Sequence, residues 1–171
     1  MIVKMVKVGY LRENCYILSI GNDAIIVDPG DEYLKIKSEL GNLNLKAVLV
    51  THRHFDHIGA LDYFSDVPVY EYKNLEEKEY QIGSFKFDVL FTGGHTFDSV
   101  TFIFDNVIFT GDFLFKGTIG RTDLETSSVY DMKRSLEKIK KYSGIIYPGH
   151  GISTTLEYEL KTNPYLRGDM I

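Results

Sequence analysis

The chain has a single cysteine, Cys15, among its 171 residues, so it cannot form an internal disulfide. Disulfides are rare in reducing compartments, and this scarcity is typical of a cytoplasmic protein. The sequence also lacks an apolar run near the ~20 residues that a membrane-spanning helix needs. Its first ten residues carry lysines inside their apolar stretch, unlike a secretory signal peptide. We therefore expect a cytoplasmic protein with no membrane partner.

Basic residues are fewer than acidic residues. The chain has 19 Lys and Arg against 24 Asp and Glu, a formal net charge of -5. Phosphate backbones favour faces rich in Lys and Arg, so nucleic acid is not the expected partner. Repeats, low-complexity tracts and linkers rich in Pro, Gly and Ser are also missing. These absences predict one domain over residues 1–171.

Short β-rich runs alternate with helical segments, which predicts an α/β (α+β) layer structure. The predicted strands are Ile2–Val6, Tyr16–Ile20, Ala24–Val27, Ala47–Val50, Val67–Tyr70, Phe85–Phe91, Val100–Phe104, Val107–Thr110 and Ile145–Tyr147. The predicted helices are Tyr33–Leu40, Ile58–Phe64, Val129–Tyr142 and Thr155–Leu160.

The placement of the histidines is the most informative feature. The chain has 5, and three of them, His52, His54 and His57, crowd into one loop after the strand Ala47–Val50. Residues two apart in an extended loop point the same way, so His52 and His54 can reach one ion. Asp56 and His57 lie where the chain turns into the next helix and can serve a neighbouring ion.

Three further candidates follow strand-like runs in glycine-rich turns. His95 lies in Gly93-Gly94-His95-Thr96, Asp112 in Thr110-Gly111-Asp112, and His150 in Pro148-Gly149-His150-Gly151. A lone histidine is more often a surface or capping residue, but here every histidine falls in a strand-end loop beside Gly or Asp. Imidazole and carboxylate ligands without thiolate suit Zn²⁺, Fe or Mn²⁺. The pattern therefore indicates a metal site at one edge of a layered sheet.

At these residues the sequence resembles the metallo-β-lactamase superfamily, whose signature is His-x-His-x-Asp-His followed by three single ligands. The resemblance implies a four-layer αββα sandwich that holds two divalent metal ions, with zinc favoured and iron or manganese compatible. It implies that His52, His54 and His95 hold the first ion, that Asp56, His57 and His150 hold the second, and that Asp112 bridges them. Asp28 resembles an early strand-end Asp of the family and is expected to orient a metal-bound histidine.

Within the superfamily the chain is similar to the glyoxalase II (hydroxyacylglutathione hydrolase) branch. The segments that carry this similarity are Asn14-Cys15-Tyr16, Asp28-Pro29-Gly30, Gly120-Arg121-Thr122-Asp123-Leu124 and Asn163-Pro164-Tyr165-Leu166. The chain departs from the branch in lacking a C-terminal helical region. It also departs at Phe97-Asp98, where relatives often have Pro-Gly, and at Arg121 and Asp123, where glutathione-contacting Lys and Tyr are usual.

The resemblance implies a hydrolase that cleaves a small-molecule thioester of the hydroxyacylglutathione type by attack of a metal-bridging hydroxide. Asp56 and Asp112 are the expected catalytic carboxylates, with Asp56 accepting the water's proton. Arg121 is a candidate for binding a substrate carboxylate, and an ion pair with Asp123 is the equal alternative. A mononuclear iron persulfide dioxygenase using His52, His95 and Asp112 is the alternative function, and a phosphodiesterase or nuclease ranks third.

Overall fold

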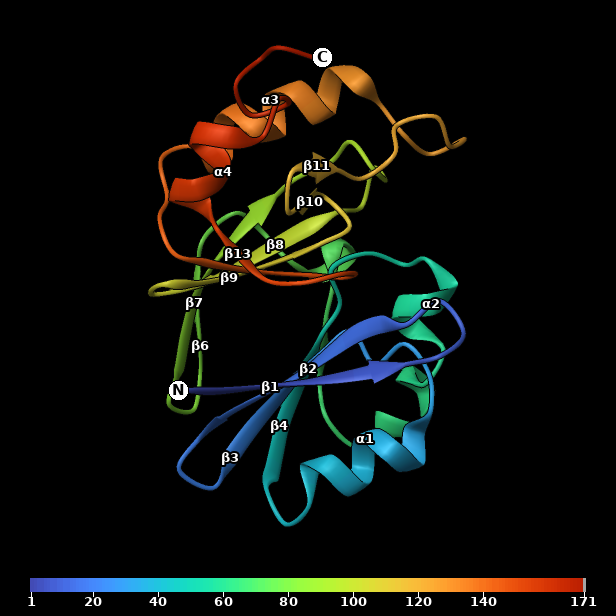
Figure 1. Cartoon of the computed structure of the whole chain (residues 1–171). Helices are drawn as coiled ribbons and strands as arrows, with labels where there is room; N and C mark the ends of the chain where they lie inside the picture. Colours follow the sequence, from blue (N-terminus) through green and yellow to red (C-terminus); the bar gives the residue numbers. More distant parts are fainter. Residues whose placement is uncertain (171) are drawn as a thin grey trace.

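Two β-sheets face each other in the computed structural model, which describes residues 1–170, and helices cover their outer faces (Figure 1). The first sheet has the order β1-β2-β3-β4-β5, formed by β1 (Ile2–Val8), β2 (Glu13–Ile20), β3 (Asp23–Val27), β4 (Asn44–Leu49) and β5 (Val69–Tyr70). Its first three strands are antiparallel hairpin neighbours, whereas β3, β4 and β5 run parallel.

The second sheet has the order β13-β12-β9-β8-β7-β6. Its strands are β6 (Glu79–Ile82), β7 (Phe85–Phe91), β8 (Val100–Phe104), β9 (Val107–Gly111), β12 (Ile145–Pro148) and β13 (Thr154–Thr155). A separate two-stranded ribbon pairs β10 (Leu114–Phe115) with β11 (Thr118–Ile119). The helices are α1 (Tyr33–Leu40), α2 (Phe55–Ile58), α3 (Val129–Ile139) and α4 (Leu156–Thr162), with 3₁₀ turns at Leu61–Phe64 and Tyr72–Asn74.

Strand alternation sorts the apolar side chains into three layers of core. In β2, Tyr16 and Leu18 point between the sheets, while Cys15 and Ile17 point to the outer face. The layer between the sheets is rich in phenylalanine and includes Phe85, Phe87, Phe102, Phe104 and Phe109. The outer layers lie under α1, through Ile36, and under α3, through Met132, Leu136 and Ile139. The fold is therefore the predicted αββα sandwich.

The carboxyl ends of the parallel strands meet at one edge of the sandwich. β4 runs parallel to β3, and β12 runs parallel to β9, so the loops that leave these strands gather there. The two sheets approach closely at this edge because Gly111, with φ of 51°, has no side chain: a Cβ there would lie 2.3 Å from Thr51 Oγ1. Gly149 is equally confined, since its Cβ would lie 2.3 Å from Asp112 Oδ1.

Two buried side chains of strand β2 form hydrogen bonds to the end of the second sheet. Asn14 Nδ2 donates to the Pro148 carbonyl at 3.0 Å and to the Gly151 carbonyl at 3.2 Å. The Tyr16 hydroxyl donates to the same Pro148 carbonyl at 2.6 Å. These bonds fix the segment that carries His150 against the first sheet.

Most predicted elements are present, and the differences are local. The predicted helix Ile58–Phe64 is wrong: α2 covers only Phe55–Ile58, and Leu61–Phe64 is a 3₁₀ turn. The predicted helix Val129–Tyr142 ends earlier, at Ile139, and the first strand of the prediction extends to Val8. Strand β2 begins at Glu13 rather than Tyr16, because a buried carboxylate and amide continue the strand. The short strands β6, β10, β11 and β13 were not predicted. No helix within residues 1–170 is long and apolar enough to span a membrane.

Leu18 and Leu34 offer a matched test of the inter-sheet core. Leu18 is fully buried between the sheets, whereas Leu34 on α1 is 77% exposed. We expect Leu18→Ala to lower the free energy of unfolding by about 2–5 kcal/mol, because it leaves a cavity. Leu34→Ala is expected to change it by less than about 0.5 kcal/mol. Urea denaturation followed by circular dichroism measures both, and equal effects would contradict this description of the core.

Candidate metal centre

The seven predicted ligands lie together at the strand-end edge of the sandwich. They arrive from both sheets: the first supplies the loop after β4, and the second supplies the loops after β7, β9 and β12. The residues are His52, His54, Asp56, His57, His95, Asp112 and His150. Residues separated by up to 98 positions in sequence thus converge, which the sequence pattern predicted.

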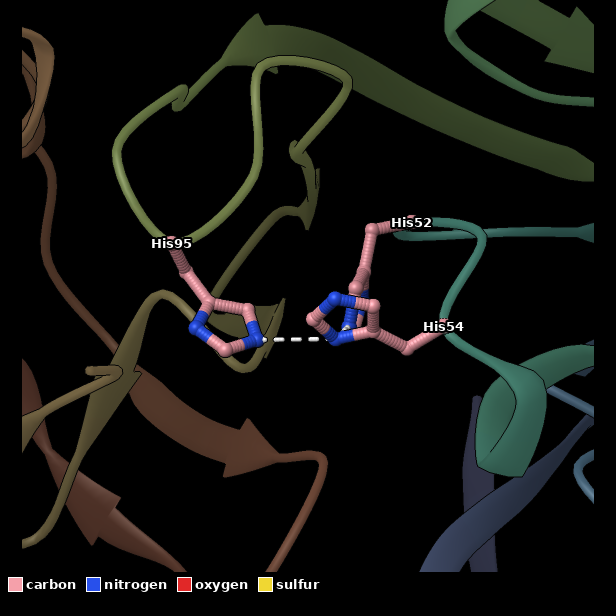
Figure 2. Close-up of side chains that lie close together, drawn as sticks. All are labelled: His52, His54 and His95. Carbon is pink, nitrogen blue, oxygen red and sulfur yellow. Dashed lines mark hydrogen bonds between the residues drawn. The ribbon is translucent and has the colours of Figure 1, made fainter. Parts of the chain in front are cut away.

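Three imidazoles form the first cluster. His52 Nε2 and His95 Nε2 each lie 3.1 Å from His54 Nδ1 (Figure 2). Nitrogens that bind Zn²⁺ at 2.0–2.1 Å in a tetrahedron are separated by about 3.3 Å, so this spacing suits one ion. Two neighbouring nitrogens can share one proton, but three converging on a point cannot all be satisfied that way. The donor set therefore fits a divalent metal.

Outer hydrogen bonds fix which nitrogen of each ring faces inward. The Thr51 hydroxyl donates to Asp28 Oδ2 at 2.6 Å, so its oxygen accepts from His52 Nδ1, 3.1 Å away. His95 Nδ1 donates to the Arg121 carbonyl at 3.0 Å. In both rings the proton is on Nδ1 and the lone pair of Nε2 points into the cluster, as a metal ligand requires.

Asp28 accepts three hydrogen bonds in this outer network. Its carboxylate accepts from the backbone N–H of Thr51 at 2.7 Å, from the Thr51 hydroxyl, and from His57 Nδ1 at 2.9 Å. The residue is buried and has a φ of 50°, a left-handed conformation that Asp tolerates better than most residues. Its position matches the orienting role that the sequence predicted.

The second cluster contains Asp56, His57 and His150. Asp56 Oδ2 lies 3.0 Å from His150 Nε2 and 3.7 Å from His57 Nε2. Because Asp28 holds the proton of His57 on Nδ1, the Nε2 lone pair of that ring faces Asp56 and Asp112. One carboxylate and two imidazoles make a donor set that suits Zn²⁺, Fe or Mn²⁺.

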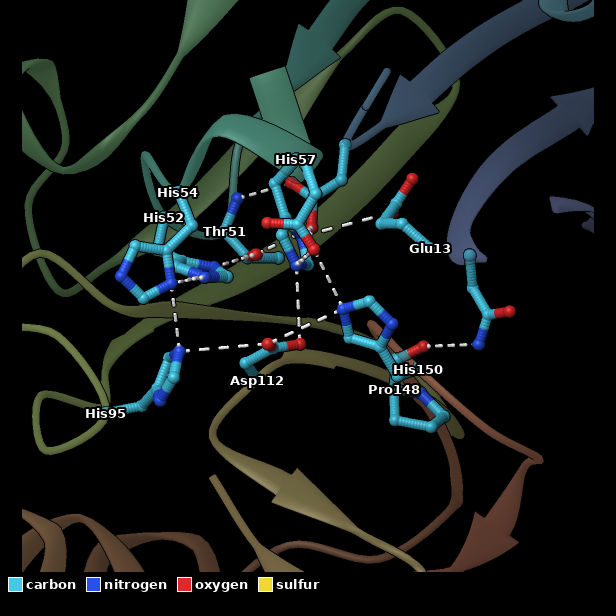
Figure 3. A network of polar contacts seen from close by, with 12 residues as sticks. Glu13, Thr51, His52, His54, His57, His95, Asp112, Pro148 and His150 are labelled. Carbon is cyan, nitrogen blue, oxygen red and sulfur yellow. Dashed lines mark hydrogen bonds and ion pairs between the residues drawn. The ribbon is translucent and has the colours of Figure 1, made fainter. Parts of the chain in front are cut away.

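Asp112 lies between the clusters (Figure 3). Its Oδ1 is 3.3 Å from His57 Nε2, and its Oδ2 is 3.6 Å from His150 Nε2 and 3.7 Å from His95 Nε2. Within residues 1–170, His57 Nε2 and Asp112 Oδ1 are buried without a hydrogen-bond partner. Such unpaired atoms are costly unless another group satisfies them, and a metal ion between them would do so.

The charge balance of the centre depends on burial and on the carboxylates. Burial lowers the pKa of His52 well below its usual value, and it lowers that of His54 too. Burial acts in the same direction on His57, but the neighbouring carboxylates of Asp112 and Asp28 outweigh it and raise the pKa of His57 well above normal. Burial opposes ionisation of Asp112, yet the neighbouring His57 keeps the pKa of that carboxyl below its usual value.

Glu13 is a site residue that the sequence reasoning missed. It begins β2, is 1% exposed, and its Oε1 lies 3.9 Å from His57 Nδ1. Burial raises its pKa well above the ordinary value of a glutamate, and within the described residues neither oxygen has a hydrogen-bond partner. A Cβ at Gly30 would lie 2.6 Å from Glu13 Oε2, so this glycine leaves room for the carboxyl. The available signal was an acidic residue beside an otherwise apolar strand.

Two of the three departures from the glyoxalase II pattern, at Phe97-Asp98 and at Arg121 and Asp123, can be located in the structure. The Arg121 guanidinium forms a two-point ion pair with Asp123, at 2.7 and 2.9 Å, and both side chains are exposed. This arrangement matches the alternative that the sequence left open for Arg121. Asp98 accepts a hydrogen bond from the backbone N–H of Arg53 at 3.2 Å, so it links the His95 loop to the loop of His52 and His54.

Comparison with known proteins agrees with this geometry. The sequence model of the Metallo-beta-lactamase superfamily matches residues 8–80 and 67–150. The chain is 34% identical to the probable metallo-hydrolase M6_Spy0554 of Streptococcus pyogenes, over 90% of this chain and 85% of that protein. It is 31% identical to the probable metallo-hydrolase YqgX of Bacillus subtilis, over 96% of this chain and 97% of that protein.

Solved structures resemble the fold closely. The BLEG-1 B3 metallo-β-lactamase superposes with a TM-score of 0.91 at 31% identity, covering 96% of this chain and 99% of that one. TTHA1623, solved in a di-iron-bound form, superposes with a TM-score of 0.86 at 32% identity, and the match covers 95% of this chain and 100% of that one. ETHE1 from Myxococcus xanthus superposes with a TM-score of 0.85 at 28% identity, and the match covers 98% of this chain and 85% of that one.

The family match spans most of the chain, and the loops that it covers carry the histidine and aspartate clusters described above. The superfamily binds divalent metals, and its relatives here are probable hydrolases. This chain belongs to the metallo-β-lactamase superfamily.

Proposed function

We propose that the chain is a dinuclear thioester hydrolase of the glyoxalase II type. The observation that carries the proposal is the position of Asp112, whose two oxygens face the His95 side and the His57 side of a divided ligand set. In this proposal His52, His54 and His95 hold one ion and Asp56, His57 and His150 hold the other, with Asp112 shared. When bound, the ions supply Lewis acidity that polarises a carbonyl and lowers the pKa of water.

The protein's own groups then have distinct tasks. Asp56 is 3.0 Å from His150, and this hydrogen bond helps to keep the pKa of Asp56 below its usual value although burial opposes ionisation. An ionised carboxylate at that position accepts a proton from the attacking water. Thr51 and Asp28 hold His52 and His57 in the orientation that binding requires. A thiolate leaves without much proton assistance, because thiol pKa values lie near ~8.5, so the site needs no dedicated acid for a thioester.

A second candidate is a mononuclear iron persulfide dioxygenase that uses His52, His95 and Asp112. Two histidines and one carboxylate with open positions are a ligand set typical of non-haem iron oxygenases. The structural similarity to ETHE1 supports this candidate, and the di-iron-bound form of TTHA1623 supports iron as a possible metal in either proposal.

Metal analysis with paired assays separates the candidates. We expect the purified protein to hold two divalent ions per chain and to cleave S-lactoylglutathione, and we expect chelation to abolish this cleavage. Metal content is measured by elemental analysis and cleavage by release of free thiol. Glutathione persulfide, with oxygen uptake recorded, is the control reaction. One Fe per chain together with oxygen consumption would overturn the first proposal in favour of the second.

Asp112→Asn tests the shared ligand. Replacing one carboxylate oxygen by an amide removes the charge that faces both clusters, so we expect metal content and turnover to fall together. The loss should exceed the about 10–100-fold effect typical of substituting a residue that only orients a ligand. Asp66→Asn, at an exposed position, is the matched control. A nearly wild-type Asp112→Asn protein would refute the shared role.

Asp28→Asn tests the outer contacts. An amide has one acceptor oxygen, so it cannot serve both the Thr51 donors and His57 Nδ1 as the carboxylate does. We expect metal affinity to weaken by about 10–100-fold while the fold is retained. Competition with a chromogenic chelator measures the affinity, and circular dichroism monitors the fold. Unchanged affinity would show that Asp28 has no orienting role.

A further inference from the structure

An apolar cleft adjoins the candidate metal centre. It has a volume of about 520 Å³ and lies between the turn that joins β1 to β2 and the start of α2. Its apolar side chains are Val8, Tyr10, Leu11 and Phe55. Asp56, one of the second-cluster residues, also lines the cleft, so the cleft and the metal centre share a wall.

Three of these side chains, Tyr10, Leu11 and Phe55, are exposed, and backbone contacts fix the turn that carries the first two. Gly9, with φ of 68°, and Arg12, with φ of 55°, bracket a turn closed by a bond from Arg12 N to the Gly9 carbonyl. Glu32 Oε2 accepts from the N–H of Gly9 at 2.9 Å and anchors the turn to the segment before α1. Tyr10 is 96% exposed, and Phe55 is 74% exposed even though its neighbours His54 and Asp56 belong to the metal clusters.

Charge decides what kind of group the cleft accepts. Apart from Asp56, which belongs to the second cluster, the ionisable residue that lines it is Asp31, a carboxylate. A group that carries its own carboxylate, such as either end of glutathione, is repelled there, whereas a neutral hydrocarbon chain is not. Aromatic and aliphatic walls with few polar groups are typical of small-molecule pockets of this size.

We propose that this cleft binds the acyl chain of the substrate, so that the preferred thioester carries an uncharged aliphatic or aromatic acyl group longer than acetyl. The inference rests on the proposed thioester hydrolysis and adds the substrate class to it. The thioester carbonyl would lie beside Asp56, the acyl chain would extend between Leu11 and Phe55, and the thiol portion would point away from the cleft.

A series of thioesters with one leaving group tests this. We expect kcat/KM for S-acyl-N-acetylcysteamines to rise from acetyl through butanoyl to hexanoyl, by about fourfold per methylene while the cleft is filling. Tyr10→Ser and Phe55→Ser should remove most of this gain. Tyr130→Ser on α3 is the matched control, because Tyr130 is 70% exposed and lies outside the cleft, and it should keep the wild-type gain. A flat series in the wild type would overturn the proposal.

A binding readout keeps the two proposals distinguishable. Metal-free protein is titrated with S-hexanoyl-N-acetylcysteamine while the backbone amides are followed by NMR. Shifts centred on Gly9, Leu11 and Gly59 that weaken in Phe55→Ser support the cleft even if no thioester is hydrolysed, in which case only the proposed function fails. Shifts elsewhere, or none, overturn the cleft assignment. Sedimentation tests the other occupant: a dimer that Tyr10→Ser dissociates would assign the cleft to a second copy of the chain and overturn the proposal.

Discussion

The carboxylate of Asp28 holds the edge of the sandwich in its working arrangement. Asp28 directly follows β3, and its carboxylate accepts two hydrogen bonds from Thr51, just beyond β4, and a third from His57 on α2. Without it, a buried hydroxyl, a buried N–H and a buried imidazole would lose their partner together, and such losses are costly. Through Thr51 the same carboxylate also sets the proton on His52. One side chain therefore couples strand pairing in the first sheet to the orientation of two candidate ligands.

The second half of the centre is built on the other sheet, and the two halves meet because small residues allow it. Gly111 and Gly149 leave the space that Thr51 and Asp112 occupy. The inter-sheet layer of phenylalanines supplies the apolar burial that holds the sheets together, while the edge itself is polar. Stability and chemistry are thus divided between the centre of the sandwich and its rim, as is common where loops on a rigid scaffold carry function.

The sequence predicted the layered fold and the grouping of the seven candidate ligands, because each ligand follows a strand and parallel strands end at one edge. It failed where the outcome depends on tertiary contacts. Glu13 stands beside an apolar strand in the sequence, but its place beside His57 follows from the packing of β2 against α2. The helix predicted over Ile58–Phe64 is interrupted at Gly59, where a Cβ would lie 2.3 Å from the Gly30 carbonyl. For Arg121 the spacing alone left two partners equally plausible, and only the structure shows the pair with Asp123.

The hydrogen bonds from Asn14 and Tyr16 to the Pro148 carbonyl join positions 134 and 132 residues apart in the chain. Contacts of such long range form late in folding, because the entropy of closing the intervening loop must be overcome first. During synthesis the first sheet leaves the ribosome well before the segment that carries His150. A nascent chain therefore cannot assemble the second cluster until nearly all of it has emerged. Before that point the nascent chain can offer a complete first cluster of His52, His54 and His95, whereas the second cluster still lacks His150.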